Sequence, residues 1–138
     1  MVLASLLEPL RVVRDNTQAD LAWTVLSFTD SPITSSSGIQ VAPDCCIRNA
    51  PASDLTIIIG GDNFRTEVEH CKLGSRLGPL LTSGAVIGAD TGAWYLARLG
   101  CLQGRKATIH WHLHSEFAEQ FLNVDVVDEN FVRDGRFW

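Results

Sequence analysis

The sequence lacks any apolar run that approaches the roughly 20 residues needed to cross a bilayer, so we expect no membrane partner. Its apolar start contains Glu8, has no basic residue ahead of it and ends in no small-residue cleavage site, which excludes a secretory signal peptide. Basic residues are scarce too. The 11 Lys and Arg against 16 Asp and Glu give a net charge of −5, which disfavours direct binding to nucleic acid or to an anionic membrane. We therefore expect a cytoplasmic protein.

The sequence also lacks internal repeats, low-complexity tracts and cysteines at zinc-binding spacing. Its cysteines are Cys45, Cys46, Cys71 and Cys101. Adjacent cysteines rarely bond to each other, so we expect free thiols in a reducing cytosol, with no metal and no cofactor. The chain does have 138 residues of which 46% are apolar, which is enough to bury the core of one domain.

The hydrophobic pattern alternates between helices and strands. Leu3–Val13 repeats apolar residues at helical spacing despite Pro9, and the apolar run Asp54–Ile59 is typical of a parallel strand covered on both faces. The other expected elements are strands at Leu21–Phe28, Ile39–Ala42, Val86–Ala89, Ala107–His110 and Val124–Val127, and helices at Gly92–Leu99 and Ser115–Phe121. Thr29–Gly38 is expected to form a loop or a short edge hairpin, and Asp134-Gly135 signals a hairpin turn. The alternation predicts an α/β three-layer sandwich with a mainly parallel sheet.

Both ends of the sequence look truncated. The first expected helix has no strand before it, whereas a doubly wound fold normally starts with a strand, and the chain ends on the aromatic pair Phe137-Trp138. We expect the missing first strand to leave a groove in the sheet that a partner covers or that lowers solubility.

The segment Val86–Trp94 runs from a buried strand through a turn of small residues directly into a helix. This pattern is typical of a nucleophile elbow, which holds one side chain at a helix N-terminus above the sheet. An enzyme would carry Ser or Cys at the centre, but the residue here is Asp90. Its carboxylate can cap the helix, offer a fixed negative charge to a cationic ligand, or act as a nucleophile that forms an ester. The sequence leaves these three roles open.

Three histidines alternate in His110-Trp111-His112-Leu113-His114. On a strand all three would share one face and could bind a metal, whereas on a helix only His110 and His114 could. No carboxylate or cysteine accompanies them at metal spacing, so we expect no metal site. His110 ends an expected strand at the edge of the sheet that carries the elbow, where it can act as a base or hydrogen-bond Asp90.

The glycine pair Gly60-Gly61 ends the Ile-rich strand. Its backbone N–H groups can form an oxyanion hole or bind a carboxylate, although a sharp turn would need glycine as well. Ligands of parallel α/β sheets bind outside the carboxyl ends of the strands, so the pair is expected to converge with Asp90 and His110. Three aromatic residues lie beside these positions in the sequence, namely Trp94, Tyr95 and Trp111. Their rings can hold a quaternary ammonium or guanidinium group by cation–π contact, or pack in the core.

Six segments follow one another in an order that resembles one family. They are Leu7–Arg11, Ser36–Ile39, Gly60-Gly61, Gly88–Ala93, Leu102–Trp111 and Phe117–Phe121. The resemblance is to the N-terminal ThiJ/PfpI, class I glutamine amidotransferase-like domain of AraC/XylS-type transcriptional regulators, often labelled GlxA-like. It implies a flavodoxin-like α/β/α domain over residues 1–138, usually dimeric, that recognises a small nitrogenous metabolite such as an amino acid, betaine or carnitine. It also implies DNA binding through a C-terminal helix-turn-helix domain that this sequence does not contain.

The sequence departs from the pattern of this family at three positions. Asp90 stands where the enzymes carry their nucleophilic cysteine, Val2 falls near their supporting acidic residue, and His112 stands where Glu would follow the His-Trp pair. We therefore expect a non-catalytic sensor of a small-molecule effector. The alternatives are a hydrolase or lyase that uses Asp90 with His110, and a dimerisation module in which backbone groups satisfy Asp90. The expected ligand-binding residues are Asp90, Thr91, His110, Gly60, Gly61, Trp94 and Trp111.

Overall fold

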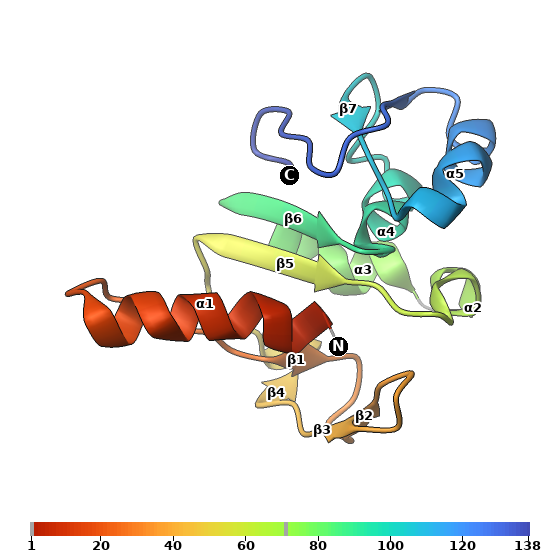
Figure 1. The fold of residues 1–138 in the computed structure, drawn as a ribbon. Coiled ribbons are helices and arrows are strands. Elements are labelled where there is room, and N and C mark those ends of the chain that lie inside the picture. The colour runs from red at the N-terminus through yellow and green to blue at the C-terminus, as the bar shows by residue number, and fades with distance from the viewer. Residues whose placement is uncertain (1, 71) are drawn as a thin grey trace. The chain divides into compact units, whose positions relative to one another are not determined.

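The structure is a computed structural model that describes residues 2–70 and 72–138, and it divides into two compact units at residues 1–51 and 52–138 (Figure 1). Every residue expected to bind ligand lies in the second unit. The expectation of a single domain over the whole chain stays a prediction.

The first unit opens with α1 (Val2–Asn16), which confirms the predicted helix and extends it at both ends. Its apolar stripe is only half-buried, and Val12 and Val13 are each 44% exposed. Pro9 is accommodated inside the helix. No residue of α1 is fully buried, and side-chain pairs on its polar face can add to its stability.

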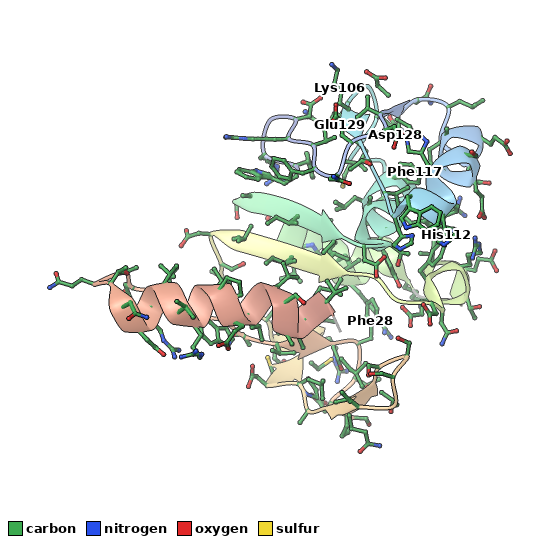
Figure 2. The ribbon with its side chains drawn as sticks, in the orientation of Figure 1. Phe28, Lys106, His112, Phe117, Asp128 and Glu129 are labelled. Atoms are coloured by element: carbon green, nitrogen blue, oxygen red, sulfur yellow. The ribbon has the colours of Figure 1, made fainter. Side chains whose placement is uncertain are left out.

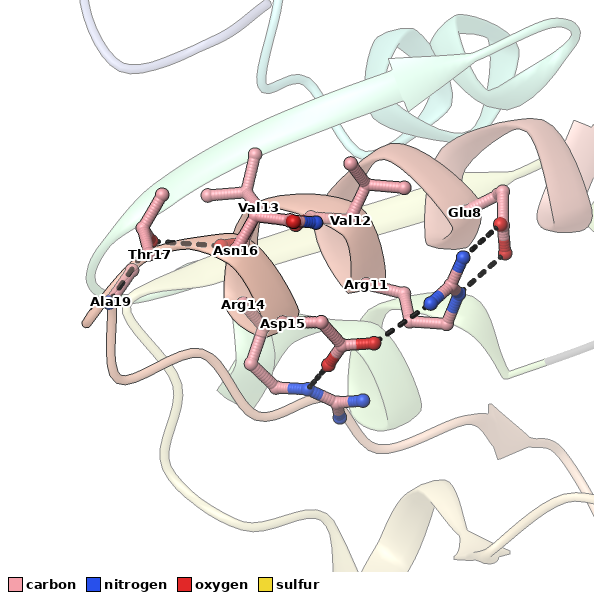
Figure 3. A network of polar contacts seen from close by, with 9 residues as sticks. All are labelled: Glu8, Arg11, Val12, Val13, Arg14, Asp15, Asn16, Thr17 and Ala19. Atoms are coloured by element: carbon pink, nitrogen blue, oxygen red, sulfur yellow. Dashed lines mark hydrogen bonds and ion pairs between the residues drawn. The ribbon is translucent and has the colours of Figure 1, made fainter.

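That polar face carries a network centred on Arg11 (Figure 3). The Arg11 guanidinium donates to Glu8 Oε2 at 3.0 Å and to Asp15 Oδ2 at 2.7 Å, and Arg14 Nε donates to Asp15 Oδ1 at 3.0 Å. The hydrogen bond from Arg11 lowers the pKa of Glu8, and those from Arg14 and Arg11 lower the pKa of Asp15. The Thr17 hydroxyl donates to Val13 O at 2.8 Å and closes the last turn.

The rest of the first unit is built from two-residue strands. These are β1 (Leu26–Ser27), parallel to β4 (Cys45–Cys46), and β2 (Ile33–Thr34), antiparallel to β3 (Gln40–Val41), followed by η1 (Ile47–Asn49). The β2–β3 pair confirms the edge hairpin, with Gly38 at φ 83° in its loop. The long strand predicted at Leu21–Phe28 is wrong outside β1. The Val25 N–H donates to the carboxylate of Asp44 at 2.7 Å rather than to a neighbouring strand.

The cysteines that the structure describes are free thiols. Cys46 is fully buried, and its Sγ donates to Phe28 O at 3.4 Å. Cys45 and Cys101 are half-buried. Cys71 lies outside the described residues, so the expectation for it stays a prediction.

The second unit is organised around the parallel pair β5 (Leu55–Ile59) and β6 (Ala85–Ala89), which confirms both predicted strands. Their register pairs Leu55 with Ala85 and Ile59 with Ala89, so the two strands end at the same level. The chain terminus lies along the other edge of β6. There Val86 N donates to Arg136 O at 2.8 Å and Gly88 N donates to Trp138 O at 2.9 Å. The predicted Asp134-Gly135 turn is confirmed, since Gly135 has φ 62° and Asp134 pairs with Phe137.

A second parallel pair, β7 (Lys106–Ala107) with β8 (Asp125–Val126), completes the described strands of this unit. Both strands are shorter than predicted. Beyond Ala107 the Thr108 hydroxyl donates to Glu129 O at 2.7 Å. A side chain therefore makes the contact that a backbone hydrogen bond would make in a longer strand. The predicted strand at Ala107–His110 is therefore wrong beyond Ala107.

Helices surround these strands. They are α2 (Phe64–His70), α3 (Leu73–Leu77), η2 (Gly78–Leu81), α4 (Gly92–Arg98), η3 (Trp111–Leu113) and α5 (His114–Gln120). The predicted helices at Gly92–Leu99 and Ser115–Phe121 are confirmed as α4 and α5, and Gly100 ends the first of them at φ 76°. α4 is apolar on every side and almost wholly buried, as expected of a core helix. The core it anchors includes Leu96, 1% exposed, and Phe117, 0% exposed.

Candidate functional site

The turn between β6 and α4 has the strained geometry of an elbow. Asp90 has φ 59°, and it is the one non-glycine residue with positive φ among the residues that the structure describes. Left-handed backbone costs an L-residue roughly 1–2 kcal/mol, less for Asp than for most because its short side chain tolerates the region. Such strain persists only where the surroundings impose it, and it concentrates at functional sites.

Close packing of glycines imposes the strain. A Cβ on Gly92 would lie 2.1 Å from Ile58 O, and a Cβ on Gly60 would lie 2.0 Å from Thr91 Oγ1. A Cβ on Gly88 would lie 2.8 Å from the backbone N of Ala93. The elbow is therefore pressed against the end of β5, and larger residues at these positions would push it away.

The Gly60-Gly61 pair lies directly beside the elbow. The Thr91 hydroxyl, in a residue only 7% exposed, donates to Gly61 O at 3.2 Å, and Gly60 N donates to Ala89 O at 3.2 Å. The Gly60 N–H is thus used within the fold. Gly61 is exposed, and its N–H donates to no group within residues 2–70 and 72–138, so a ligand would find one donor here rather than two. The structure brings together Gly60, Gly61, Asp90 and Thr91.

Asp90 itself is exposed at the carboxyl ends of β5 and β6. The interpretation of Asp90 as a helix cap is wrong, because the N-cap of α4 is Thr91 and no side chain caps that helix. Across the described part of the chain, no hydrogen bond or ion pair reaches the Asp90 carboxylate. The structure thus presents an uncompensated negative charge at the edge of the sheet where ligands of such folds bind.

The histidine segment forms an exposed aromatic stack rather than a strand. His110 Nδ1 accepts a hydrogen bond from the backbone N of His112 at 3.4 Å and so begins η3. The His110 and His112 rings are 5.5 Å apart at 11°, and the Trp111 and His112 rings are 3.3 Å apart at 28°. Trp111 is 71% exposed. Figure 2 labels His112 on this segment, which leads into α5.

The histidines do not share one strand face, because residues 111–113 form a 3₁₀ turn. His114 begins α5, and its Nε2 is buried without a hydrogen-bond partner among the described residues. Within the same residues, no three His, Cys, Asp or Glu side chains gather as metal ligands would. Nor does a hydrogen bond join Asp90 to His110 in the described structure.

The aromatic residues separate into two groups. Trp94 is 7% exposed, and its ring lies 4.9 Å from Phe64, 5.8 Å from Phe117 and 5.2 Å from Phe121. Phe117 is labelled on α5 in Figure 2. Tyr95 is 3% exposed, and its hydroxyl donates to the Glu67 carboxylate. Core packing accounts for both rings of α4, whereas Trp111 is open to a ligand.

An ion pair that the sequence does not predict joins α2 to α5. Arg65 on α2 binds Glu116 on α5 through both nitrogens of its fork, with Nε donating to Oε1 at 2.9 Å and Nη2 donating to Oε2. The guanidinium lies 4.5 Å from the Phe64 ring centre and 5.8 Å from that of Trp94. The pair raises the pKa of Arg65 and lowers that of Glu116. No local pattern could reveal it, because 51 residues separate the partners.

The elbow and the glycine pair form a rim at the carboxyl ends of β5 and β6, and two hollows of the second unit are lined by other residues. A cavity of about 100 Å³ lies between β6, α4, β7 and the terminal segment, and its walls include Leu96, Phe131 and Trp138. A hollow of about 270 Å³ lies beside Phe121 and Leu122. Neither is lined by a residue of the predicted site.

A strained elbow between a parallel strand and a buried helix, with a glycine pair beside it, defines an elbow-bearing α/β domain. The chain belongs to the DJ-1/PfpI family, whose profile matches residues 3–138. This confirms the resemblance on which the sequence analysis relied.

Curated relatives of the chain include regulators and an enzyme. HTH-type transcriptional regulator GbdR of Pseudomonas aeruginosa is 34% identical over 96% of this chain, which spans 36% of that protein. HTH-type transcriptional regulator CdhR of the same species is 35% identical over 98% of the chain, which spans 40% of that protein. Isonitrile hydratase of Pseudomonas putida is 30% identical over 88% of the chain, which spans 51% of that protein. The chain thus corresponds to well under half of either regulator.

Solved structures show the same fold. A transcriptional regulator protein from Vibrio parahaemolyticus matches with a TM-score of 0.83 at 23% identity, over 98% of this chain and 73% of that one. An AraC family transcriptional regulator from Pseudomonas putida matches with a TM-score of 0.77 at 22% identity, over 93% and 69%. The predicted flavodoxin-like α/β fold is therefore confirmed. In the part of the chain that the structure describes, no helix is long and apolar enough to span a membrane.

Proposed function

We propose that this chain is a non-catalytic sensor domain of a cytoplasmic transcriptional regulator, and that it binds a small nitrogenous cation at Asp90. The observation that carries the proposal is the exposed carboxylate of Asp90, held at φ 59° and left without a partner among the described residues. The carboxylate charge in this strained turn is available to a ligand, because no group of the described residues pairs with it. The regulators among the relatives support this role.

The exposed groups of the predicted site suit a quaternary ammonium or guanidinium ligand. Asp90 supplies the counter-charge, and the exposed Trp111 ring offers a π-face within the same unit. Cation–π contacts of this kind are worth roughly 0.5–2 kcal/mol, more when water is excluded. The Gly61 N–H can donate to an acceptor on the ligand. An amino acid, betaine or carnitine has this combination of charges.

Calorimetric titration with glycine betaine, carnitine and arginine tests the proposal. We expect at least one to bind the wild-type protein, and the Asp90→Asn variant to bind it at least tenfold more weakly, because Asn keeps the shape and removes the charge. Asp54→Asn is the matched control, since Asp54 is an exposed aspartate at the amino end of β5. If no compound binds, or if Asp90→Asn binds as well as wild type, the sensor role of Asp90 is wrong.

A transcriptional regulator must also bind DNA and commonly forms a dimer, and we propose how this protein does each. The chain spans only 36–40% of the two regulators, and its net charge of −5 disfavours binding to the DNA phosphates. We propose that DNA is bound by a C-terminal helix-turn-helix domain and that this domain forms a homodimer. Sedimentation of the purified chain should give twice the monomer mass, and a single monomeric species at all concentrations would contradict the dimer.

The alternative is a hydrolase or lyase that uses Asp90 with His110, and isonitrile hydratase among the relatives favours it. Mass spectrometry after incubation with activated esters or 2-oxoaldehydes separates the two. We expect no adduct on Asp90, because no hydrogen bond joins it to His110 in the described structure. A covalent adduct that Asp90→Asn abolishes would support the enzyme instead.

A further inference from the structure

The Arg65–Glu116 pair joins two helices that each follow a segment of the predicted site. α2 begins three residues after Gly61, and Phe64 N donates to Gly61 O at 3.2 Å. α5 follows η3, which holds the His110–Trp111 stack. The pair therefore links the helix that follows the glycine pair to the helix that follows the aromatic stack.

Arg65 is also held in place independently of Glu116. Its guanidinium lies over Phe64 and Trp94, at 4.5 Å and 5.8 Å from the ring centres. Trp94 lies four residues after Asp90, in the first turn of α4. A stacked guanidinium keeps its planar fork oriented, which makes it a preformed receptor for a carboxylate. Its present carboxylate comes from the protein, and both side chains are about half exposed, at 49% and 47%.

We infer that Arg65 is a second recognition group of the site and takes the carboxylate of a zwitterionic ligand whose cationic end lies at Asp90. The ligand carboxylate displaces Glu116 from the fork and so frees α5 from α2. Exposed ion pairs contribute little, typically about 0–1 kcal/mol, so one carboxylate can replace another at small cost. This inference rests on the proposed sensing function and adds the group that takes the ligand's carboxylate and the helix that responds to it.

Two ligand pairs that differ at the carboxylate test the inference by calorimetry. Arginine is compared with agmatine, and glycine betaine with choline, on wild type, Arg65→Gln and Glu116→Gln. In wild type the carboxylate-bearing partner should bind about tenfold more tightly, as expected for a charged hydrogen-bonded pair. Arg65→Gln should abolish that preference, and Glu116→Gln should increase it about threefold, because the internal competitor is gone.

Glu8→Gln is the matched control. Glu8 forms the same kind of forked pair with Arg11, on an exposed helix of the other unit. It should leave both affinities and the preference unchanged. If the preference survives Arg65→Gln, or if Glu116→Gln behaves like Glu8→Gln, the inference is wrong while the sensor function stands. If neither member of either pair binds wild type, both fail.

Hydrogen–deuterium exchange gives an independent readout of the displaced pair. Saturating arginine or glycine betaine should speed exchange of the α5 amides, and Glu116→Gln should show the faster exchange without ligand. Agmatine and choline should leave α5 as it is in the free protein. Slower exchange in α5 on binding of the carboxylate-bearing ligand would contradict displacement of Glu116.

Discussion

Asp90 combines a left-handed backbone with an exposed charge. The backbone conformation follows from the glycines packed around the elbow, and the charge follows from the residue type alone. The geometry and the chemistry are therefore separable by mutation. A substitution at Asp90 can therefore remove the charge and keep the backbone conformation, or strain the backbone as well.

Replacing Asp90 by Asn should leave the free energy of unfolding within about 0.5 kcal/mol of wild type, because Asn tolerates positive φ as Asp does. Replacing it by Val should destabilise the protein by more than about 1 kcal/mol, since a β-branched residue is strained at φ 59°. Urea unfolding followed by circular dichroism measures both. Equal stability of the two variants would show that the elbow is not strained in solution.

Gly92 sets the distance between the elbow and β5. Gly92→Ala should destabilise the fold by about 1–3 kcal/mol or more, because the new Cβ would lie 2.1 Å from the carbonyl oxygen of Ile58. Gly61→Ala is the control, since no atom lies within 4 Å of its Cβ position and its φ is not positive. The same unfolding measurement should place Gly61→Ala close to wild type. Similar losses in both variants would mean that the close approach at Gly92 is not what matters.

At the scale of elements, the sequence predicted best where the pattern was strongest. β5, β6 and α4 are continuous apolar segments, and tertiary context leaves such segments few alternatives. Only two residues of the strand expected at Leu21–Phe28 form β1, because β4 pairs with only two residues. A high β-propensity reflects how well a residue fits against a neighbouring strand, and here most of the segment has no such neighbour.

The elements that were missed are short or depend on distant residues. α2 and α3 have seven and five residues, too few to show a clear helical period. The stretch His110–His114 alternates like a strand, yet the His110 ring accepts the backbone N–H of His112 and turns it into a 3₁₀ segment. The elbow and the glycine pair of the predicted site lie side by side in the structure, whereas Trp94 packs in the core. Whether these residues bind ligand stays a prediction.

The link between α2 and α5 makes a prediction about pH. Arg65 holds the pKa of Glu116 below its ordinary value of 4.5. The contribution of the pair is therefore present above that value and is lost as the pH falls through the lowered pKa. In an NMR titration, Arg65→Gln should raise the pKa of Glu116 back toward 4.5. An unchanged titration curve would show that the pair does not persist in solution.

At the scale of the whole molecule, the fold and the charge have different consequences. The DJ-1/PfpI fold extends over nearly the whole chain, whereas the relatives that regulate transcription are more than twice as long. With a net charge of −5 the chain should show no binding to duplex DNA in fluorescence anisotropy, even at low salt where non-specific binding is strongest. Salt-dependent binding of DNA by this chain alone would contradict the proposal that a separate C-terminal domain binds DNA.

The most direct test of the central claim is a crystal structure of the protein soaked with arginine or glycine betaine. We expect the cationic group to lie within hydrogen-bond or ion-pair distance of the Asp90 carboxylate, on the rim formed by the ends of β5 and β6. Ligand density in the apolar cavity beside Phe131 and Trp138, with the Asp90 carboxylate facing only solvent, would contradict it.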